Sequence, residues 1–164
     1  MEILNLNRNM AHLALLQRIE LASPLLKKLR KVLGRYLFSK FISKYFINVK
    51  KISEDYSILM KNEVSSISKF LKQNQNILSI GGGIAGLEII IMKKFSTSKI
   101  TFIEKNYISK KIKYGWDDKN LEGYNSLNLM QNLLFDNNIS SSRYNIINYN
   151  SEIFPKNNFD LIIS

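Results

Sequence analysis

The chain has 164 residues, of which 45% are hydrophobic and 11% aromatic, and its formal net charge is +11. This length and apolar content predict one globular domain and exclude a disordered polypeptide. There is no cysteine and only one histidine, His12. Disulfides, a cysteine nucleophile and a thiolate metal site are therefore excluded, a histidine metal site is disfavoured, and a reducing compartment is expected.

The positive charge is concentrated in the first third of the chain. Residues 1–61 hold 12 basic and 4 acidic residues, a net charge of +8, whereas residues 62–164 have a net charge of only +3. Such an excess suggests an anionic partner, although the lysine-rich composition of the whole chain explains part of it. The first residues show no basic segment ahead of an apolar block, so we expect a soluble, cytoplasmic protein.

Residues 9–47 are predicted to be helical. Ser23 and Pro24 are typical of a helix cap and a first helical residue. Apolar residues then recur with helical spacing at Leu25, Leu26, Leu29, Val32, Leu33, Tyr36, Leu37 and Phe41, with lysines and arginines mostly on the other side. We favour the hypothesis that this apolar face covers the rest of the domain. The alternative is weak contact with an anionic membrane, or with another protein.

The remaining chain alternates between helical and strand-like patterns. Helices are predicted at 54–73, 86–94 and 124–138, and strands at 77–80, 99–104, 144–149 and 159–164. This alternation predicts an α/β fold with a Rossmann-like doubly wound parallel sheet in residues 54–164, preceded by a basic helical segment in residues 1–53. About four strands are present. Sheets of this kind usually have five or more, so we expect a chain truncated after its fourth strand.

A glycine loop separates the first predicted strand from the next helix. Gly81, Gly83 and Gly86 have the spacing G-x-G-x-x-G, and Gly82 adds a fourth glycine. Glycines allow sharp turns and close approach of a ligand, and the following helix presents free N–H groups to a phosphate or a carboxylate. Glu104 ends the second strand, where a carboxylate can accept the hydroxyls of a ribose. The pattern predicts an adenosine-containing cofactor.

Two families share parts of this pattern. The segments IGGGIAGLE and TFIEK resemble the start of FAD- and NAD-dependent oxidoreductases. The long helical region ahead of the loop and NYNSEIFPKNNFDLIIS at 148–164 resemble class I S-adenosylmethionine-dependent methyltransferases instead. That resemblance covers about residues 54–164. The segment KKIKYGWDDKN…YNSLNLMQNLL is also similar to sugar and small-molecule O-methyltransferases. We favour the methyltransferase interpretation.

The methyltransferase resemblance implies a set of cofactor-binding residues. Glycines of the loop would line the methionine and ribose portions of S-adenosylmethionine, and Glu104 would bind the ribose hydroxyls. Asn150 and the backbone of Ser151 would face the adenine. The full predicted set is Ser79, Gly81, Gly82, Gly83, Ala85, Gly86, Glu104, Lys105, Asn150 and Ser151. The sequence departs from the family at Ser79, where an acid is usual, and at Ala85, where a glycine is usual.

The resemblance implies transfer of a methyl group to oxygen or nitrogen of a small molecule such as a sugar. No catalytic base can be assigned, because Tyr114, Asp117 and Asp118 lie with Trp116 in a loop that is also typical of solvated residues. Ser164 would lie where the fourth strand faces the substrate. The alternatives are a dinucleotide-dependent oxidoreductase and a non-catalytic binding module. Nucleic-acid binding is disfavoured, because the basic residues lack an interleaved aromatic platform.

Overall fold

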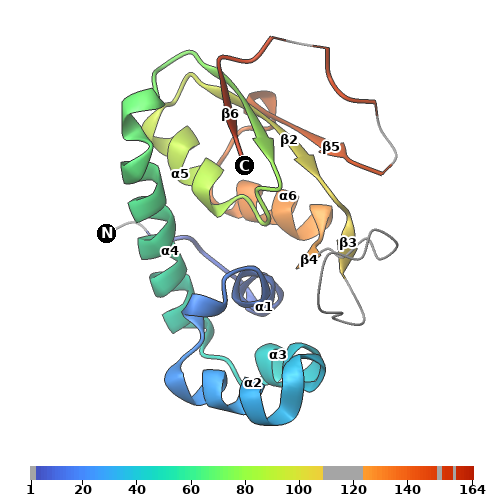
Figure 1. Ribbon diagram of the computed structural model, residues 1–164. Coiled ribbons are helices and arrows are strands. Elements are labelled where there is room, and N and C mark those ends of the chain that lie inside the picture. The colour runs from blue at the N-terminus through green and yellow to red at the C-terminus, as the bar shows by residue number, and fades with distance from the viewer. Residues whose placement is uncertain (1–2, 109–123, 151–152, 157) are drawn as a thin grey trace.

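The computed structural model describes residues 3–108, 124–150, 153–156 and 158–164. It is an α/β structure in which four of the described strands form one parallel sheet. These are β1 (Asn76–Ile80), β2 (Lys99–Glu104), β5 (Tyr144–Asn148) and β6 (Leu161–Ile163). Their order across the sheet is β5-β2-β1-β6, so the chain steps outward from β1 in one direction and then returns to its other side (Figure 1). This confirms the predicted Rossmann-like sheet.

Strand pairing is extensive in the centre of the sheet. β1 pairs with β2 from Asn76↔Lys99 to Ile80↔Ile103, and β2 pairs with β5 up to Glu104↔Asn148. Asp160 fixes the last strand, because its carboxylate accepts the backbone N–H of Asn76 at 2.7 Å. The glycine loop and Glu104 therefore lie at the carboxyl ends of adjacent strands, where ligands bind in sheets of this kind.

Helices cover one face of the sheet. α4 (Val49–Ser66), α5 (Gly86–Lys94) and α6 (Leu127–Asp136) pack on this face together with α1 (Arg8–Gln17). Their apolar side chains form one continuous core with Ile77, Ile100 and Phe102 of the strands. Leu78, Ile103 and Ile147 form a smaller cluster on the other face. Within the described residues, no helix is long and apolar enough to cross a membrane.

The predicted helix at 9–47 is wrong as a single element. The chain forms α1, a 3-10 turn at Ile19–Leu21, α2 (Pro24–Leu37), a π-helical turn at Phe38–Ile42 and α3 (Ser43–Tyr45). The break precedes Pro24, and the hydroxyl of Ser23 accepts the backbone N–H of Leu26 at 3.3 Å, so the predicted cap is confirmed. Asn7 caps α1 in the same way.

Several other boundaries differ from the sequence-based expectation. α4 begins at Val49, five residues before the predicted start, because the side chain of Asn48 caps it. A 3-10 turn at Ser68–Phe70 follows the end of α4. The helix predicted at 124–138 begins only at Leu127, after Ser126 caps it. Residues Tyr124–Asn125 form β4 instead, which pairs with β3 (Tyr107–Ile108). A 3-10 turn at Ser141–Arg143 leads into β5, while α5 and β2 match their predicted bounds.

Candidate functional site

The glycine loop turns through the left-handed backbone region more than once. Gly81 has φ +72° and Gly83 has φ +63°, values that glycine adopts without steric cost. Ala85 also has a positive φ, 69°, although its side chain is completely buried. The position that departs from the family pattern therefore has a backbone conformation that favours glycine. The loop is tied to β2, because the N–H of Gly81 donates to the carbonyl of Ile103 at 3.1 Å.

Two other glycines in the loop are required by close packing. A Cβ atom at Gly82 would lie 2.5 Å from Oε1 of Glu88 and 2.6 Å from Oγ of Ser79. A Cβ atom at Gly86 would overlap the ring and hydroxyl of Tyr56, which α4 places against the start of α5. Neither glycine has a positive φ. Glycine is therefore needed at these two positions because a side chain would not fit, and not because of the backbone conformation.

Glu104 is held by the loop and by a residue that sequence reasoning missed. Its Oε1 accepts the backbone N–H of Gly83 at 3.3 Å, and its Oε2 accepts the side-chain amide of Asn125 at 2.5 Å. The same amide donates to the carbonyl of Gly83 at 2.7 Å. Burial raises the pKa of Glu104, and these hydrogen bonds oppose that shift. Asn125 thus joins the acid to the glycine loop.

Glu88 places a second carboxyl group beside the loop. It belongs to the first turn of α5, is 1% exposed, and its Oε1 accepts the hydroxyl of Ser79 at 2.5 Å. Its Oε2 has no hydrogen-bond partner among the described residues. Burial raises the pKa of Glu88 to about 7, and the hydrogen bond from Ser79 acts in the opposite direction. A carboxyl group from the helix therefore contacts Ser79 at the end of β1.

These groups line a cavity of about 1060 Å³. Its floor is the glycine loop with Ser79 and Glu88, and one side is formed by Glu104, Lys105 and Asn125. Residues of α4 and the turn that follows it, of α5 and of β6 complete the lining with the apolar side chains of Met60, Ile67, Phe70, Leu87, Ile162 and Ile163. The cavity lies at the crevice where the strand order reverses between β1 and β6, as expected for this sheet topology.

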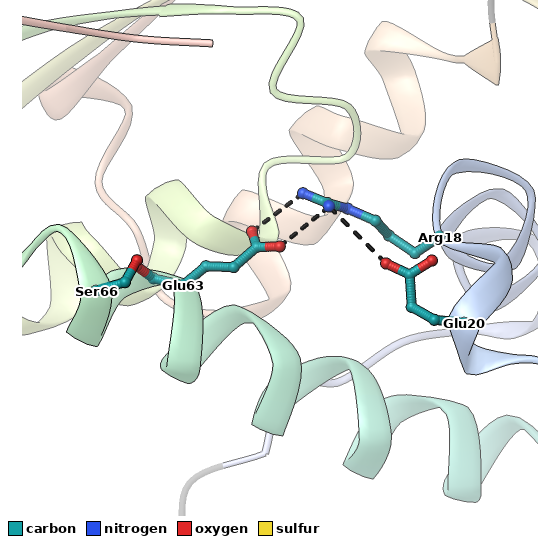
Figure 2. Close-up of polar contacts among 4 residues, drawn as sticks. All are labelled: Arg18, Glu20, Glu63 and Ser66. Carbon is teal, nitrogen blue, oxygen red and sulfur yellow. Dashed lines mark hydrogen bonds and ion pairs between the residues drawn. The ribbon is translucent and has the colours of Figure 1, made fainter.

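An ion pair between the end of α1 and α4 also lines the cavity. Arg18, directly after α1, contacts both carboxylate oxygens of Glu63 on α4 at 3.0 Å (Figure 2). Glu20 lies 3.9 Å from the same guanidinium, so the Arg18 side chain is held between two carboxylates. Arg18, Glu63 and Ser66 line the cavity, and each can hydrogen-bond a polar ligand.

Most of the predicted cofactor residues meet at this cavity. Its lining includes Ser79, Gly81, Gly82, Gly83, Glu104 and Lys105, and also Ser164. Ala85 and Gly86 are buried beneath the loop and shape it from below. Asn150 is exposed and is not part of this lining; its N–H donates to the side chain of Asn148 at 3.2 Å. Its assignment to adenine stays a prediction. Ser151, Tyr114, Trp116, Asp117 and Asp118 lie outside the described residues.

Glu88 and Gln17 are cavity residues that the sequence-based set did not contain. Glu88 had a visible signal, since it is a lone carboxyl group in the apolar helix GLEIIIM. Gln17 had none, because its side chain reaches the loop from α1, where it accepts the N–H of Ile84 at 3.4 Å across 67 residues of sequence. No protein-family model matches the chain, and no curated protein matches it. The chemistry of the cavity is therefore the basis for a functional assignment.

Proposed function

We propose that the chain binds S-adenosylmethionine in this cavity and is a methyltransferase that acts on oxygen or nitrogen of a small molecule. The observation that carries the proposal is Glu88, a cavity-lining residue whose Oε1 lies next to Gly82 and whose buried Oε2 has no partner among the described residues. A buried polar atom without a partner is costly, and a ligand that donates to it removes that cost.

The sign of the charge at the loop separates the cofactor classes. A dinucleotide places its anionic pyrophosphate against the glycine loop and the start of the following helix. Here Oε1 of Glu88 lies directly beneath Gly82. The pKa of Glu88 is about 7, so above this pH an ionised carboxylate would repel that pyrophosphate. The methionine portion of S-adenosylmethionine carries an ammonium and a sulfonium beside one carboxylate, so its net charge is positive and an ionised Glu88 attracts its two cationic groups. Glu88 therefore supports the methyltransferase interpretation over FAD or NAD.

Glu104 fits the ribose of the same cofactor. It ends β2, lines the cavity, and is oriented by Gly83 and Asn125. An ionised carboxylate has about four acceptor positions, so these two bonds leave capacity for the two ribose hydroxyls. The glycine loop would thus bind the methionine portion of the cofactor, and Glu104 would bind its ribose.

The part of the cavity that Arg18 and Glu63 line is suited to the methyl acceptor. S-adenosylmethionine supplies an activated methyl group, so the protein's task is to hold the acceptor atom in line with it and to exclude water. Arg18 and Glu63 offer fixed donors and acceptors, while Met60 and Phe70 offer apolar surface. This combination suits a hydroxyl-rich molecule such as a sugar, in which polar edges alternate with C–H faces.

Calorimetric titration with two adenosine ligands tests the proposal. S-adenosylhomocysteine contains the amino-acid group, whereas methylthioadenosine lacks it. We expect both to bind the chain, and Glu88→Gln to weaken S-adenosylhomocysteine by about tenfold or more while leaving methylthioadenosine unchanged. Glu104→Gln should weaken both ligands, because both contain the ribose.

Asp136→Asn is the matched control, since it removes an exposed carboxylate that does not line the cavity and should leave both affinities unchanged. Binding of NAD or FAD in place of S-adenosylhomocysteine would overturn the proposal in favour of an oxidoreductase. If none of these ligands binds, the proposal fails and a non-catalytic role is favoured.

A further inference from the structure

The helix α2 has an amphipathic surface that the rest of the protein covers only in part. At about 100° per residue, its apolar side chains fall within about 140° of the helix circumference. Leu26 on one side of this arc packs against the core. On the other side, Leu25 is 66% exposed and Val32 81% exposed. The expectation that the apolar face covers the domain therefore holds for Leu26 but not for the exposed side chains of the arc.

Further apolar side chains extend this exposed surface. Leu33 and Leu37 continue it along α2, and Phe41, Tyr45 and Phe46 are all more than a third exposed in the turn and helix that follow. Figure 1 shows α2 and α3 together at the end of the molecule opposite the sheet, beyond α1. We name the exposed side chains of Leu25, Val32, Leu33 and Leu37 the α2 apolar surface. Clustered exposure of this kind marks an interaction site.

Positive charge borders the α2 apolar surface on both sides. By helix geometry Lys28 lies next to Val32 at one border of the arc, and Arg30 lies next to Leu37 at the other. Lys27, Lys28 and Lys31 are exposed. Residues 21–53 contain nine lysines and arginines and no aspartate or glutamate. The partner must therefore combine an apolar interior with dense negative charge at its surface.

We propose that α2 docks this protein on an anionic membrane surface, with the α2 apolar surface at the level of the acyl chains and the flanking lysines at the headgroups. Interfacial helices have this combination of an apolar face and a basic polar face. A second copy of the chain is disfavoured, because pairing two such faces brings like charges together. Nucleic acid would engage the lysines but would leave the exposed leucines and valine in water. The inference is independent of the proposed methyltransferase activity.

Vesicle co-sedimentation of the full chain tests the inference. We expect binding to vesicles of phosphatidylcholine mixed with phosphatidylglycerol, and little binding to phosphatidylcholine alone. Leu25→Ser/Val32→Ser should abolish most of the binding. Lys28→Gln/Lys31→Gln should weaken it, at roughly fivefold per lysine, which corresponds to about 1 kcal/mol each. Because all four side chains are exposed, circular dichroism should show unchanged folding.

Matched controls lie elsewhere on the surface. Phe135→Ser removes an apolar side chain of α6 that is 77% exposed, and Lys99→Gln/Lys156→Gln removes two exposed lysines outside α2. These variants should bind vesicles as the unaltered chain does, apart from a small effect of net charge. Equal losses in the controls, equal binding to neutral vesicles, or no vesicle binding would overturn the inference. So would a dimer that Val32→Ser dissociates, or RNA binding without vesicle binding.

Discussion

Glu88 destabilises the folded chain and also lines the candidate binding site. Its neighbours in α5 are apolar, and its carboxyl group is buried beneath Gly82 with one hydrogen bond, from Ser79. Water would solvate both oxygens in the unfolded chain, whereas the folded chain leaves Oε2 without a partner among the described residues. Folding therefore disfavours the ionised form of Glu88. This effect can be measured from the pH dependence of the free energy of unfolding.

The stability of the chain should depend on pH through Glu88. Its pKa is raised from 4.5 to about 7 by burial. Between these values the folded state binds more protons than the unfolded state, so stability is lost as pH rises. At 1.36 kcal/mol per pH unit, the free energy of unfolding should fall by about 3 kcal/mol over this range.

Urea unfolding of the unaltered chain and of Glu88→Gln, followed by circular dichroism between about pH 4 and pH 8, measures this contribution. Glutamine cannot ionise, so the difference in unfolding free energy between the two proteins isolates Glu88. The raised pKa of Glu104 is common to both proteins, and the charge of Glu104 is a lesser cause of the Glu88 shift than burial is. A difference that stays constant with pH would show that Glu88 is not destabilised by burial in its charged form.

At the scale of secondary-structure elements, the contact between α4 and α5 determines how the glycine loop sits. Tyr56 of α4 is buried against the first turn of α5, and the backbone of Gly86 hydrogen-bonds its hydroxyl. This bond satisfies one of the free N–H groups at the helix start. Burial, with the nearby charge of Glu88 as a second cause, raises the pKa of Tyr56, so the hydroxyl stays neutral.

Gly86→Ala should destabilise the fold by about 1–3 kcal/mol, because the added methyl group overlaps the Tyr56 ring. This outcome opposes the intrinsic helix propensity, which favours alanine over glycine. Chemical denaturation of Gly86→Ala, Tyr56→Leu and the double variant forms a cycle that measures the coupling. The double variant should be more stable than the sum of the single effects predicts. Simple additivity would mean that the two residues do not compete for the same space.

Local signals explain which elements the sequence predicted well. α5 and β2 match their expected bounds, because the glycine loop marks the helix start and the apolar run KITFIE marks the strand. The short pairing of Tyr107–Ile108 with Tyr124–Asn125 joins segments that are distant in sequence, and no local pattern indicates it. Asn125 therefore appeared to belong to a helix, although its amide binds Glu104 and Gly83. The glycines and Glu104 could be predicted, whereas the contacts that hold them required the fold.

At the scale of the whole molecule, the N-terminal helices and the sheet share a single core. Leu13 and Leu15 of α1 are almost completely buried in the same cluster as Ile100 and Phe102. The backbone N–H of Leu4 donates to the hydroxyl of Ser57 at 2.8 Å, which joins the start of the chain to α4. The division expected between residues 1–53 and 54–164 can therefore be examined by unfolding experiments.

Leu13→Ala should lower the stability of the whole chain by about 2–5 kcal/mol, because it leaves a cavity in the shared core. Leu25→Ala is the matched control, since this side chain is 66% exposed and its loss should cost less than about 0.5 kcal/mol. Urea unfolding followed by circular dichroism should show one transition that Leu13→Ala shifts as a whole. A separate early transition in that variant would show that the N-terminal segment folds as its own unit.

The position of β6 next to β1 has a consequence for the order in which the chain folds during synthesis. β1 is a central strand, and one of its two edges pairs with β6. The contact between Asn76 and Asp160 spans 84 residues of sequence, so this edge stays unpaired until β6 has been synthesised. Until then β1 exposes unpaired N–H and C=O groups, the kind of edge that favours intermolecular association. Contacts of such long sequence separation also slow folding. The nascent chain therefore passes through a stage in which protection of this edge by a chaperone would raise the yield of folded protein.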